Sequence, residues 1–500
     1  MEKADLGLCS NQMNDLNVHQ AGSEREVPKA RMRFCHGKFR LFGHFVHAQF
    51  VLLALIEFGL ISAVSYSVNA GSAAVDASGS FLWLLLSAVM PVAAFSFSLA
   101  AMGLYDTRQR QSFNGIASRI VVAILFGMVL CACVGFIFPQ TTLTAGSLGL
   151  TSLGSLAVVA IVRGLFYAFV DGHMLRKRVI VIGVGQRASS IDRLRRKSDM
   201  RAVNLLGFVC LDESTQREVD QDRILKIKGS IRDFAIANRV DEIVIALDDR
   251  RQKLPVEDLL DCRMSGIDIV DMLDFFERER GIILLSLLYP GWLVFAKGFA
   301  PDALRAFKKR ALDWLVSFVL LLVFAPFMLL TALAIYIESG FKGPILYRQK
   351  RVGRHGHVFD VIKFRSMRTD AEASGKAQWA VDNDPRVTRV GHFIRKYRLD
   401  ELPQLWNVFV GDMSLVGPRP ERPEFVEHLG EINSLYRERH RLSPGVTGWA
   451  QLCYPYGASD EDSIQKLQYD LYYVKNHSIF LDIYILIQTV EVVLFKKGSR

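Results

Sequence analysis

The chain has 500 residues, half of them hydrophobic, and a formal net charge of +10. Its mean hydropathy of +0.20 is too high for an ordinary soluble protein, and its length allows two or three domains. A basic excess of this kind has three common partners: nucleic acid, an anionic membrane surface or a phosphorylated substrate. The seven cysteines show neither zinc-ligand nor redox C-x-x-C spacing, so a zinc module is excluded and reduced thiols are expected.

The first third of the chain contains four long apolar segments. Each has about 20 residues, the length of an α-helix that crosses the hydrocarbon core of a bilayer. We therefore predict a four-helix transmembrane domain over residues 46–172. Its segments are residues 48–68, 81–103, 117–138 and 147–169. Residues 1–45 are polar and basic and lack the short apolar core of a signal peptide, so we expect a disordered cytoplasmic segment there.

The loops between these segments predict their orientation. Lysines and arginines precede the first segment, among them Arg31 and Arg33, and Arg108 and Arg110 lie between the second and third. Another basic group, including Arg176, follows the fourth segment, whereas the two remaining loops have no lysine or arginine. Because positively charged loops stay in the cytoplasm, both ends of the bundle are predicted to be cytoplasmic.

A fifth apolar segment, residues 311–337, breaks this alternation. Lysines and arginines flank it on both sides, so both of its ends favour the cytoplasm. Pro326 lies near its middle and removes one helix hydrogen bond. This pattern favours a re-entrant membrane helix, a hairpin that enters one leaflet and returns at Pro326. The alternative is a kinked spanning helix, which would place the C-terminal domain outside.

The sequence pattern of residues 173–298 predicts a soluble, Rossmann-like α/β domain. Apolar runs at 178–183, 204–211, 241–247 and 266–272 alternate with polar or helical stretches, a pattern typical of a parallel sheet. The turn after the first run, "GVGQRA", has Gly183 and Gly185 at the spacing of a dinucleotide-binding loop. The acidic residue expected about 20 positions later is absent. A structural turn is therefore favoured, and nucleotide binding is the alternative.

The C-terminal third is strongly basic near its start. Residues 342–400 contain fourteen lysines and arginines against six acidic residues. This region follows a membrane element and has no recognisable nucleic-acid-binding module, so nucleic acid is not an expected partner. Anionic head groups or a diphosphate substrate fit the basic clusters better, because Arg and Lys bind phosphate oxygens through charge-assisted hydrogen bonds. A solvated basic face is the remaining alternative.

Two adjacent carboxylates, Asp400 and Glu401, follow this basic region. Pro403 suits the first turn of a helix, so the pair is predicted just before or at a helix N-terminus. There, one carboxylate can attack phosphorus, and the other can hold a Mg²⁺ ion that neutralises a diphosphate. The strip "VGPRPERPEF", residues 416–425, has three prolines around Arg419, which would fix its guanidinium; an exposed proline-rich turn is the alternative.

The last 200 residues resemble the bacterial sugar transferase family, the polyisoprenyl-phosphate hexose-1-phosphate transferases. The strings that carry the resemblance are "GPILYRQKRVGRHGHVFDVIKFRSM", "DPRVTRVGHFIRKYRLDELPQLWNVFVGDMSLVGPRPERPEF" and "LSPGVTGWAQ". Four preceding spans and an α/β domain are similar to the long-form members, which prime exopolysaccharide or O-antigen synthesis. The resemblance implies a mostly α-helical catalytic domain over residues 305–500.

The resemblance also implies roles for particular residues. Asp400 would be the nucleophile on the β-phosphate of a UDP-sugar, and Glu401 would be the Mg²⁺ ligand. Basic residues of the matching motifs would bind phosphates; these are Lys363, Arg365, Arg395 and Arg419. Asp400 would displace UMP, and undecaprenyl phosphate would then attack the phosphosugar–aspartyl intermediate.

The implied setting is the cytoplasmic face of a bacterial inner membrane. The resemblance does not decide whether the hexose is glucose, which we favour, or galactose. It also does not decide whether the protein forms a homodimer.

Two other functions compete with a sugar transferase: a membrane-anchored nucleotide-sugar dehydratase or epimerase, and a non-catalytic polysaccharide-export scaffold. None of the 14 tyrosines has a lysine four residues later, which argues against the first, because those enzymes use a Tyr-x-x-x-Lys pair. The apolar tail, residues 469–495, is expected to lie on the bilayer surface, with packing into the domain core as the alternative.

Overall fold

A computed structural model gives the architecture of most of the chain. The described residues are 38–41, 44–73, 81–105, 113–137, 144–169, 176–194, 203–211, 216–227, 229–249, 254–288, 296, 298–299, 302–369, 384, 386–454, 457 and 459–494. Most of the predicted N-terminal segment therefore lies outside the described residues. Its last part differs from the prediction of disorder through residue 45, because strands β1 (Lys38–Leu41) and β2 (His44–His47) pair antiparallel.

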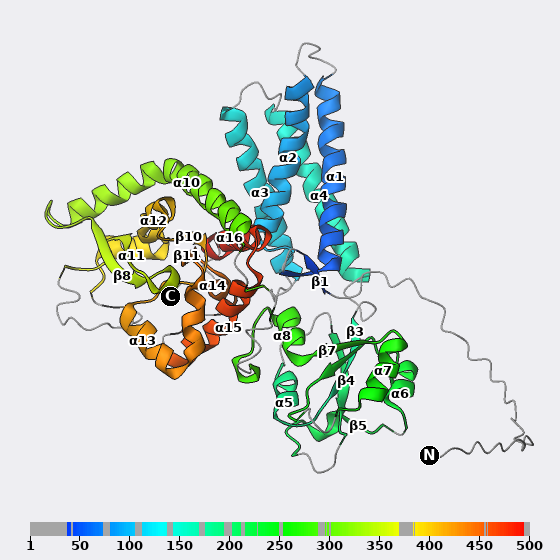
Figure 1. Cartoon of the computed structure of the whole chain (residues 1–500). Helices are drawn as coiled ribbons and strands as arrows, with labels where there is room; N and C mark the ends of the chain where they lie inside the picture. The colour runs from blue at the N-terminus through cyan, green and yellow to red at the C-terminus, as the bar shows by residue number, and fades with distance from the viewer. Residues whose placement is uncertain are drawn as a thin grey trace, which may run out of the picture. The chain divides into compact units, whose positions relative to one another are not determined.

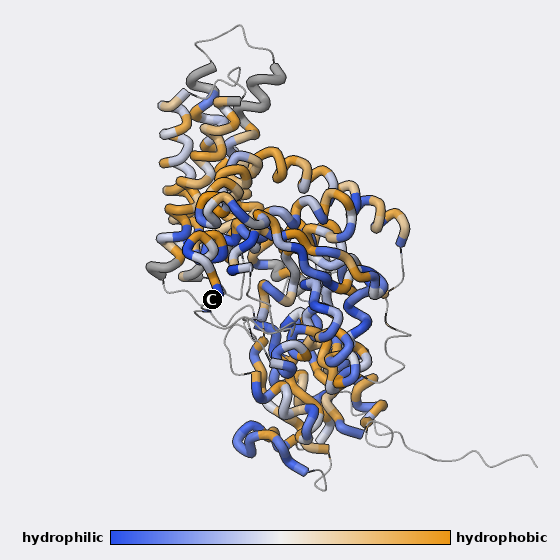
Figure 2. Tube along the Cα trace, turned by 90° about the vertical axis from the view of Figure 1, so that its left-hand side faces the viewer, coloured by the Kyte–Doolittle hydropathy of each residue, from blue (hydrophilic) through white to orange (hydrophobic). Residues whose placement is uncertain are grey.

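Four apolar helices occupy the predicted transmembrane region (Figure 1). They are α1 (Ala48–Ala73), α2 (Phe81–Ala101), α3 (Phe113–Ile137) and α4 (Ala145–Phe169). Among the described residues, α1, α3 and α4 are long and apolar enough to cross a membrane, and so is the later helix α10 (Ala303–Glu338). Figure 2 shows apolar residues concentrated in this bundle and along α10.

A buried ion pair links the bundle helices α1 and α4. Arg163 Nε lies 2.8 Å from Glu57 Oε1, and both side chains are almost fully buried. Arg163 also donates to the carbonyl oxygen of Leu104 over 2.8 Å, just beyond the end of α2. Charges inside a membrane bundle are stable only when paired, so this contact fixes the packing of three helices.

The α/β domain has a parallel five-stranded sheet in the order β5-β4-β3-β6-β7. Its strands are β3 (Lys177–Ile182), β4 (Val203–Val209), β5 (Ile224–Leu225), β6 (Glu242–Ile245) and β7 (Asp268–Asp271). The four strands predicted from the apolar runs are confirmed. Helices cover both faces: α5 (Gln186–Asp192), α6 (Ile231–Ala237), α7 (Val256–Met264) and α8 (Met272–Arg280). Alternate residues of β3 face the two cores, with Val179 and Val181 beside α5 and α8, and Ile180 and Ile182 beside α6 and α7.

Helix α10 continues through Pro326 without a break. The predicted hairpin with a turn at Pro326 is therefore replaced by one helix of 36 residues, which arches in Figure 1. The physical reason is that a proline inside a helix removes one hydrogen bond and bends the axis, while the remaining hydrogen bonds keep the helix intact.

Both ends of α10 contact the C-terminal domain. Near its start, Lys309 Nζ lies 2.8 Å from Asp482 Oδ2, and Arg310 donates to the carbonyl oxygen of Val408 over 2.6 Å. At its end, Glu338 accepts from the backbone amide of Val390 over 3.0 Å. Most of the apolar side chains between these ends are exposed.

The C-terminal domain combines two small sheets with short helices. Strands β8 (Leu346–Val352) and β9 (Val358–Phe364) form an antiparallel hairpin, and β10 (Ser414–Val416) pairs in parallel with β11 (Gly445–Thr447). The α-helices are α11 (Arg389–Lys396), α12 (Gln404–Val410), α13 (Pro423–Ile432), α14 (Trp449–Cys453), α15 (Asp460–Asn476) and α16 (Ile479–Leu494). The mostly helical domain expected from the resemblance is confirmed.

Helix α16 corrects the preferred interpretation of the tail as a surface helix. Leu481 and Ile485 are fully buried in the domain core, and Thr489 hydrogen-bonds Thr447 of β11 over 2.8 Å. Asp482, which interrupts the apolar sequence, is the buried partner of Lys309. The polar residues of α16 therefore serve internal contacts, and the alternative of core packing is correct.

Candidate active site

The carboxylate pair lies in a tight turn between two helices. Helix α11 ends at Lys396, and Arg398 then adopts a left-handed conformation with φ 57° and ψ 20°. A single 3₁₀ turn, η5 (Leu399–Glu401), carries both acids, and Pro403 directly precedes α12. The prediction that the pair lies at a helix N-terminus is confirmed.

Glu401 is held by three cations. Its Oε1 lies 3.1 Å from Arg419 Nη2, 3.4 Å from Lys363 Nζ and 3.8 Å from Arg398 Nη1. Burial alone would raise the pKa of Glu401, but these three charges hold it well below its ordinary value. The surrounding charges therefore favour the ionised form of Glu401, and all three of these distances are to the same carboxylate oxygen.

Asp400 has a different environment. It is buried, and its Oδ1 finds no hydrogen-bond partner within the part of the chain that the structure describes. Burial, together with the negative charge of Glu401, raises the pKa of Asp400 to about 6. Lys363, Arg398 and Arg395 oppose this shift. Two neighbouring carboxylates with opposite pKa shifts are a common sign of different chemical roles.

The structure brings most of the predicted phosphate-binding residues together. Lys363, at the end of β9, and Arg419, in the proline-rich strip, both contact Glu401. Arg395 on α11 acts on Asp400 through its charge. The guanidinium of Arg365 donates to the hydroxyl of Ser339, at the C-terminal end of α10. This contact connects the end of β9 to α10.

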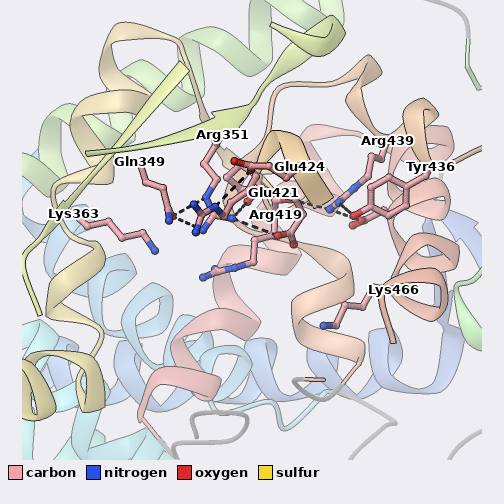
Figure 3. Close-up of polar contacts among 12 residues, drawn as sticks. Gln349, Arg351, Lys363, Arg419, Glu421, Glu424, Tyr436, Arg439 and Lys466 are labelled. Carbon is pink, nitrogen blue, oxygen red and sulfur yellow. Dashed lines mark hydrogen bonds and ion pairs between the residues drawn. The ribbon is translucent and has the colours of Figure 1, made fainter. Parts of the chain in front are cut away.

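Sequence reasoning missed several charged residues around Arg419. Figure 3 shows Arg351, Arg419 and Glu421 close together, with Lys363 directed toward the same region. Arg351 donates to the carbonyl oxygen of Pro420 over 3.0 Å, and Arg439 donates to that of Arg419 over 2.8 Å. Both arginines are far from the strip in sequence, so no local pattern could have indicated these contacts.

The carboxylate pair fits a Mg²⁺ ion. Mg²⁺ is usually bound by one or two carboxylates plus substrate phosphates, rather than by a complete protein cage. No cluster of three metal-ligating side chains occurs among the described residues. The buried Oδ1 of Asp400, which has no hydrogen-bond partner among the described residues, and the carboxylate of Glu401 supply oxygen donors of the suitable kind.

The glycine turn of the α/β domain does not fit a phosphate. The backbone amides of Gln186 and Arg187, which would face a phosphate at the start of α5, donate to the carboxylate of Asp248 over 3.0 and 2.9 Å. A Cβ atom at Gly185 would lie 1.8 Å from Asp248 Oδ2, and one at Gly183 would lie 2.4 Å from the carbonyl oxygen of Ala246. The internal packing of the domain therefore accounts for both glycines.

These features define a class of protein: a membrane protein whose C-terminal domain holds a carboxylate pair among lysine and arginine side chains. Residues 304–496 match the family described as bacterial sugar transferase, and residues 100–269 match one described as a CoA-binding domain. The chain belongs to the bacterial sugar transferase family. The donor set at the glycine turn, as described above, does not fit the phosphates of CoA.

Three characterised relatives illustrate the range of the family. The chain is 28% identical to "UDP-glucose:undecaprenyl-phosphate glucose-1-phosphate transferase" of Xanthomonas campestris over 81% of this chain and 86% of that protein. It is 30% identical to "Undecaprenyl-phosphate galactose phosphotransferase" of Salmonella typhimurium, over 67% of this chain and 73% of that protein. It is 40% identical to "UDP-N-acetylgalactosamine-undecaprenyl-phosphate N-acetylgalactosaminephosphotransferase" of Aeromonas hydrophila over 48% of this chain, a match that spans only 55% of that protein.

Proposed function

We propose that this protein transfers a hexose-1-phosphate from a UDP-sugar to undecaprenyl phosphate, releasing UMP and starting exopolysaccharide synthesis. The observation that carries the proposal is the environment of the carboxylate pair. Asp400 has a raised pKa and an unpartnered oxygen, while the adjacent Glu401 is locked among Arg419, Lys363 and Arg398. The relatives named above act on undecaprenyl phosphate with different sugars, and we choose UDP-glucose as the first donor to test.

In the first step, a carboxylate oxygen of Asp400 attacks the β-phosphorus of the UDP-sugar. The bond from this phosphorus to the bridging oxygen breaks, and UMP leaves with that oxygen and the bonding electron pair. Lys363 and Arg419, which contact the adjacent Glu401, would stabilise the negative charge on the phosphoryl oxygens. The product is a phosphosugar held on Asp400 as an acyl phosphate.

In the second step, a phosphate oxygen of undecaprenyl phosphate attacks the same phosphorus. The bond between phosphorus and Asp400 breaks, which restores the carboxylate and releases the lipid diphosphate sugar. One diphosphate linkage is consumed and another is formed, so the reaction is nearly balanced and positioning is the main task of the protein.

A Mg²⁺ ion at the Glu401 carboxylate, when bound, would neutralise charge on the donor diphosphate. Glu401 suits this role because its depressed pKa keeps it ionised at every physiological pH. Lys363 and Arg419 would then share the remaining phosphate charge with it.

The proposal includes a cytoplasmic membrane location, with α10 as a re-entrant helix. Both ends of α10 contact the same C-terminal domain, which supports entry and exit on one side of the membrane. Trp314 on α10 and Trp406 on α12 are both about half exposed, and Trp314 and Trp406 each stack on Phe409 between them. Such aromatic residues favour the membrane interface, and α12 begins just after the carboxylate pair. This arrangement would let a lipid phosphate reach Asp400.

For the α/β domain, we propose a Rossmann-like fold without a nucleotide in its glycine turn. The strand order, with the first strand central and two strands on either side, supports the fold. The carboxylate of Asp248 at the start of α5 supports the absence of a bound phosphate.

The experiment is a UMP-release assay on the purified protein with undecaprenyl phosphate, Mg²⁺ and a panel of UDP-sugars. Asp400→Asn should abolish transfer, because an amide does not form the acyl phosphate. Glu401→Gln should raise the Mg²⁺ concentration needed for half-maximal rate. Unchanged UMP release by Asp400→Asn would remove the nucleophile assignment and favour an export scaffold.

A further inference from the structure

The central part of the proline-rich strip, residues 418–421, is held through its carbonyl oxygens. Two of these four residues are prolines and have no amide hydrogen, so hydrogen bonds to the carbonyl groups must fix the conformation of this segment. All four carbonyl groups accept such bonds. The donors are the Gly445 amide to Pro418 (2.9 Å), Arg439 to Arg419 (2.8 Å), Arg351 to Pro420 (3.0 Å) and the Val352 amide to Glu421 (2.9 Å).

Two of these four donors are arginine side chains with fixed positions. Arg439 is 5% exposed, and its guanidinium lies 2.8 Å from Asp470 Oδ2 and donates to the hydroxyl of Tyr436 over 2.6 Å. Figure 3 shows Arg439 and Tyr436 side by side next to the strip. The single guanidinium of Arg439 thus connects α15, η6 (Ser434–Arg441) and the strip.

Arg351 holds the next carbonyl from the opposite side. Its Nε and Nη2 donate to Gln349 Oε1 over 3.0 and 2.6 Å, and its Nη1 lies 3.4 Å from Glu421 Oε2. These contacts lock a guanidinium of β8 against the strip. A lysine has a single ammonium group and cannot reproduce this planar set of donors.

We propose that Arg351 and Arg439 are positioning residues for Arg419. Arg439 holds the carbonyl group of Arg419 and Arg351 holds that of the next residue, Pro420, while the side chain of Arg419 reaches Glu401 at 3.1 Å. The two residues act on the donor diphosphate through Arg419 and do not touch it. This inference rests on the proposed function, in which Arg419 binds the phosphates of the UDP-sugar.

The test compares Arg439→Lys in two backgrounds, wild type and Arg419→Ala. Alone, Arg439→Lys should lower kcat/KM for the UDP-sugar by tenfold or more, since misplacing a binding group by about 1 Å can cost on the order of 10²-fold. In the Arg419→Ala background, the same substitution should change kcat/KM by less than about twofold, because the group it positions is gone. Arg437→Lys, on the exposed side of the same η6 segment, is the matched control and should leave the rate unchanged.

Arg351→Lys gives an independent test. It replaces Arg439→Lys if thermal unfolding in detergent shows that Arg439→Lys fails to fold. Arg351→Lys should likewise lower kcat/KM in the wild type and change it little in the Arg419→Ala background. Equal losses in both backgrounds, or no loss from either lysine variant, would overturn the positioning role. If Arg419→Ala itself retained full activity, the phosphate-binding role in the proposed function would fail instead, so the two failures are distinguishable.

Discussion

At the scale of single residues, the different environments of Asp400 and Glu401 matter most. Three cations around Glu401 lower its pKa, whereas burial and the negative charge of Glu401 raise the pKa of Asp400 to about 6. A nucleophile whose pKa lies slightly below the working pH is ionised and still more basic than an ordinary aspartate. In the proposed mechanism, the pair thus separates the nucleophile from the site of positive charge.

This separation predicts the pH dependence of the reaction. Because the proposed mechanism needs Asp400 as the carboxylate, kcat/KM should fall as the pH drops through about 6, by about tenfold per pH unit at the acid end. Arg395→Met removes a positive charge that lowers the pKa of Asp400, so the acid limb should move to higher pH. Steady-state rates between pH 5 and 8 would measure the midpoint.

The neighbouring Lys396→Met is the matched control, since Lys396 is exposed and is not among the main charges that shift the pKa of Asp400. Its midpoint should equal that of the wild type. A midpoint that stays in place for Arg395→Met, while its overall rate falls, would assign Arg395 to substrate contact alone.

Residue-level sequence reasoning placed the acid pair correctly but not all of its partners. The pattern "RLDELPQL" was sufficient to put Asp400 and Glu401 before a helix, because Pro403 marks a first turn. The position of Arg365 at Ser339 and the hold of Arg439 on the strip depend on tertiary contacts between distant segments. No local spacing encodes such contacts.

At the scale of elements, helix α10 is attached to the catalytic domain by buried polar groups. Lys309 donates to the carbonyl oxygen of Val416, to the hydroxyl of Tyr473 and to Asp482. Asp313, one turn further on, accepts from the backbone amide of Leu415 over 3.0 Å. These contacts fix the start of the membrane helix against β10, close to the strip that carries Arg419.

Lys309→Met should strongly destabilise the protein. It leaves the buried Asp482 carboxylate without its cation, and breaking a buried pair by removing one partner costs about 3–5 kcal/mol. Thermal unfolding in detergent would measure the loss. Lys308→Met, at an exposed position one residue earlier, is the control. Adding Asp482→Leu to Lys309→Met should recover part of the stability, because the double variant has no unpaired buried carboxylate. If Lys309→Met unfolded at the same temperature as its control, the attachment would contribute nothing.

The start of helix α5 gives a second prediction at this scale. Since Asp248 occupies the two amides that a phosphate would need, the full-length protein should not bind CoA or NAD measurably in equilibrium dialysis. Asp248→Ala should lower stability by about 0.5–2 kcal/mol through loss of this cap, while Asp222→Ala, at an exposed position of the same domain, should not. Saturable binding of either nucleotide that weakened in a Gly185→Ala variant would refute the structural role of the turn.

The elements themselves followed from sequence where periodicity was strong. The parallel strands and the four apolar helices of the bundle occur where apolar runs predict them. Helices α10 and α16 differ from the predictions because composition does not show tertiary contacts or local hydrogen bonds. It does not show that the helix continues through Pro326, and it does not show that Lys309 is the partner of the buried Asp482. The Glu57–Arg163 ion pair was not predicted either, because both residues lie in segments that are apolar on average.

At the scale of the whole molecule, the proposal requires both ends of α10 to face the cytoplasm. In a variant whose seven native cysteines are replaced by serine, Lys308→Cys and Lys342→Cys place single thiols at exposed positions, one near the start of the helix and one just after its end. In right-side-out vesicles, both should be protected from a membrane-impermeant maleimide, and in inverted vesicles both should react. Labelling of the two cysteines from opposite sides would establish a spanning helix and contradict the re-entrant arrangement.

The central claim is that Asp400 carries the phosphosugar between donor and acceptor, and isotope exchange tests it most directly. Labelled UMP is incubated with the protein, Mg²⁺ and unlabelled UDP-sugar in the absence of undecaprenyl phosphate. A covalent intermediate predicts that label enters the UDP-sugar with the wild-type protein and not with Asp400→Asn. Full transfer to lipid phosphate without any such exchange, or exchange that persists in Asp400→Asn, would contradict the account.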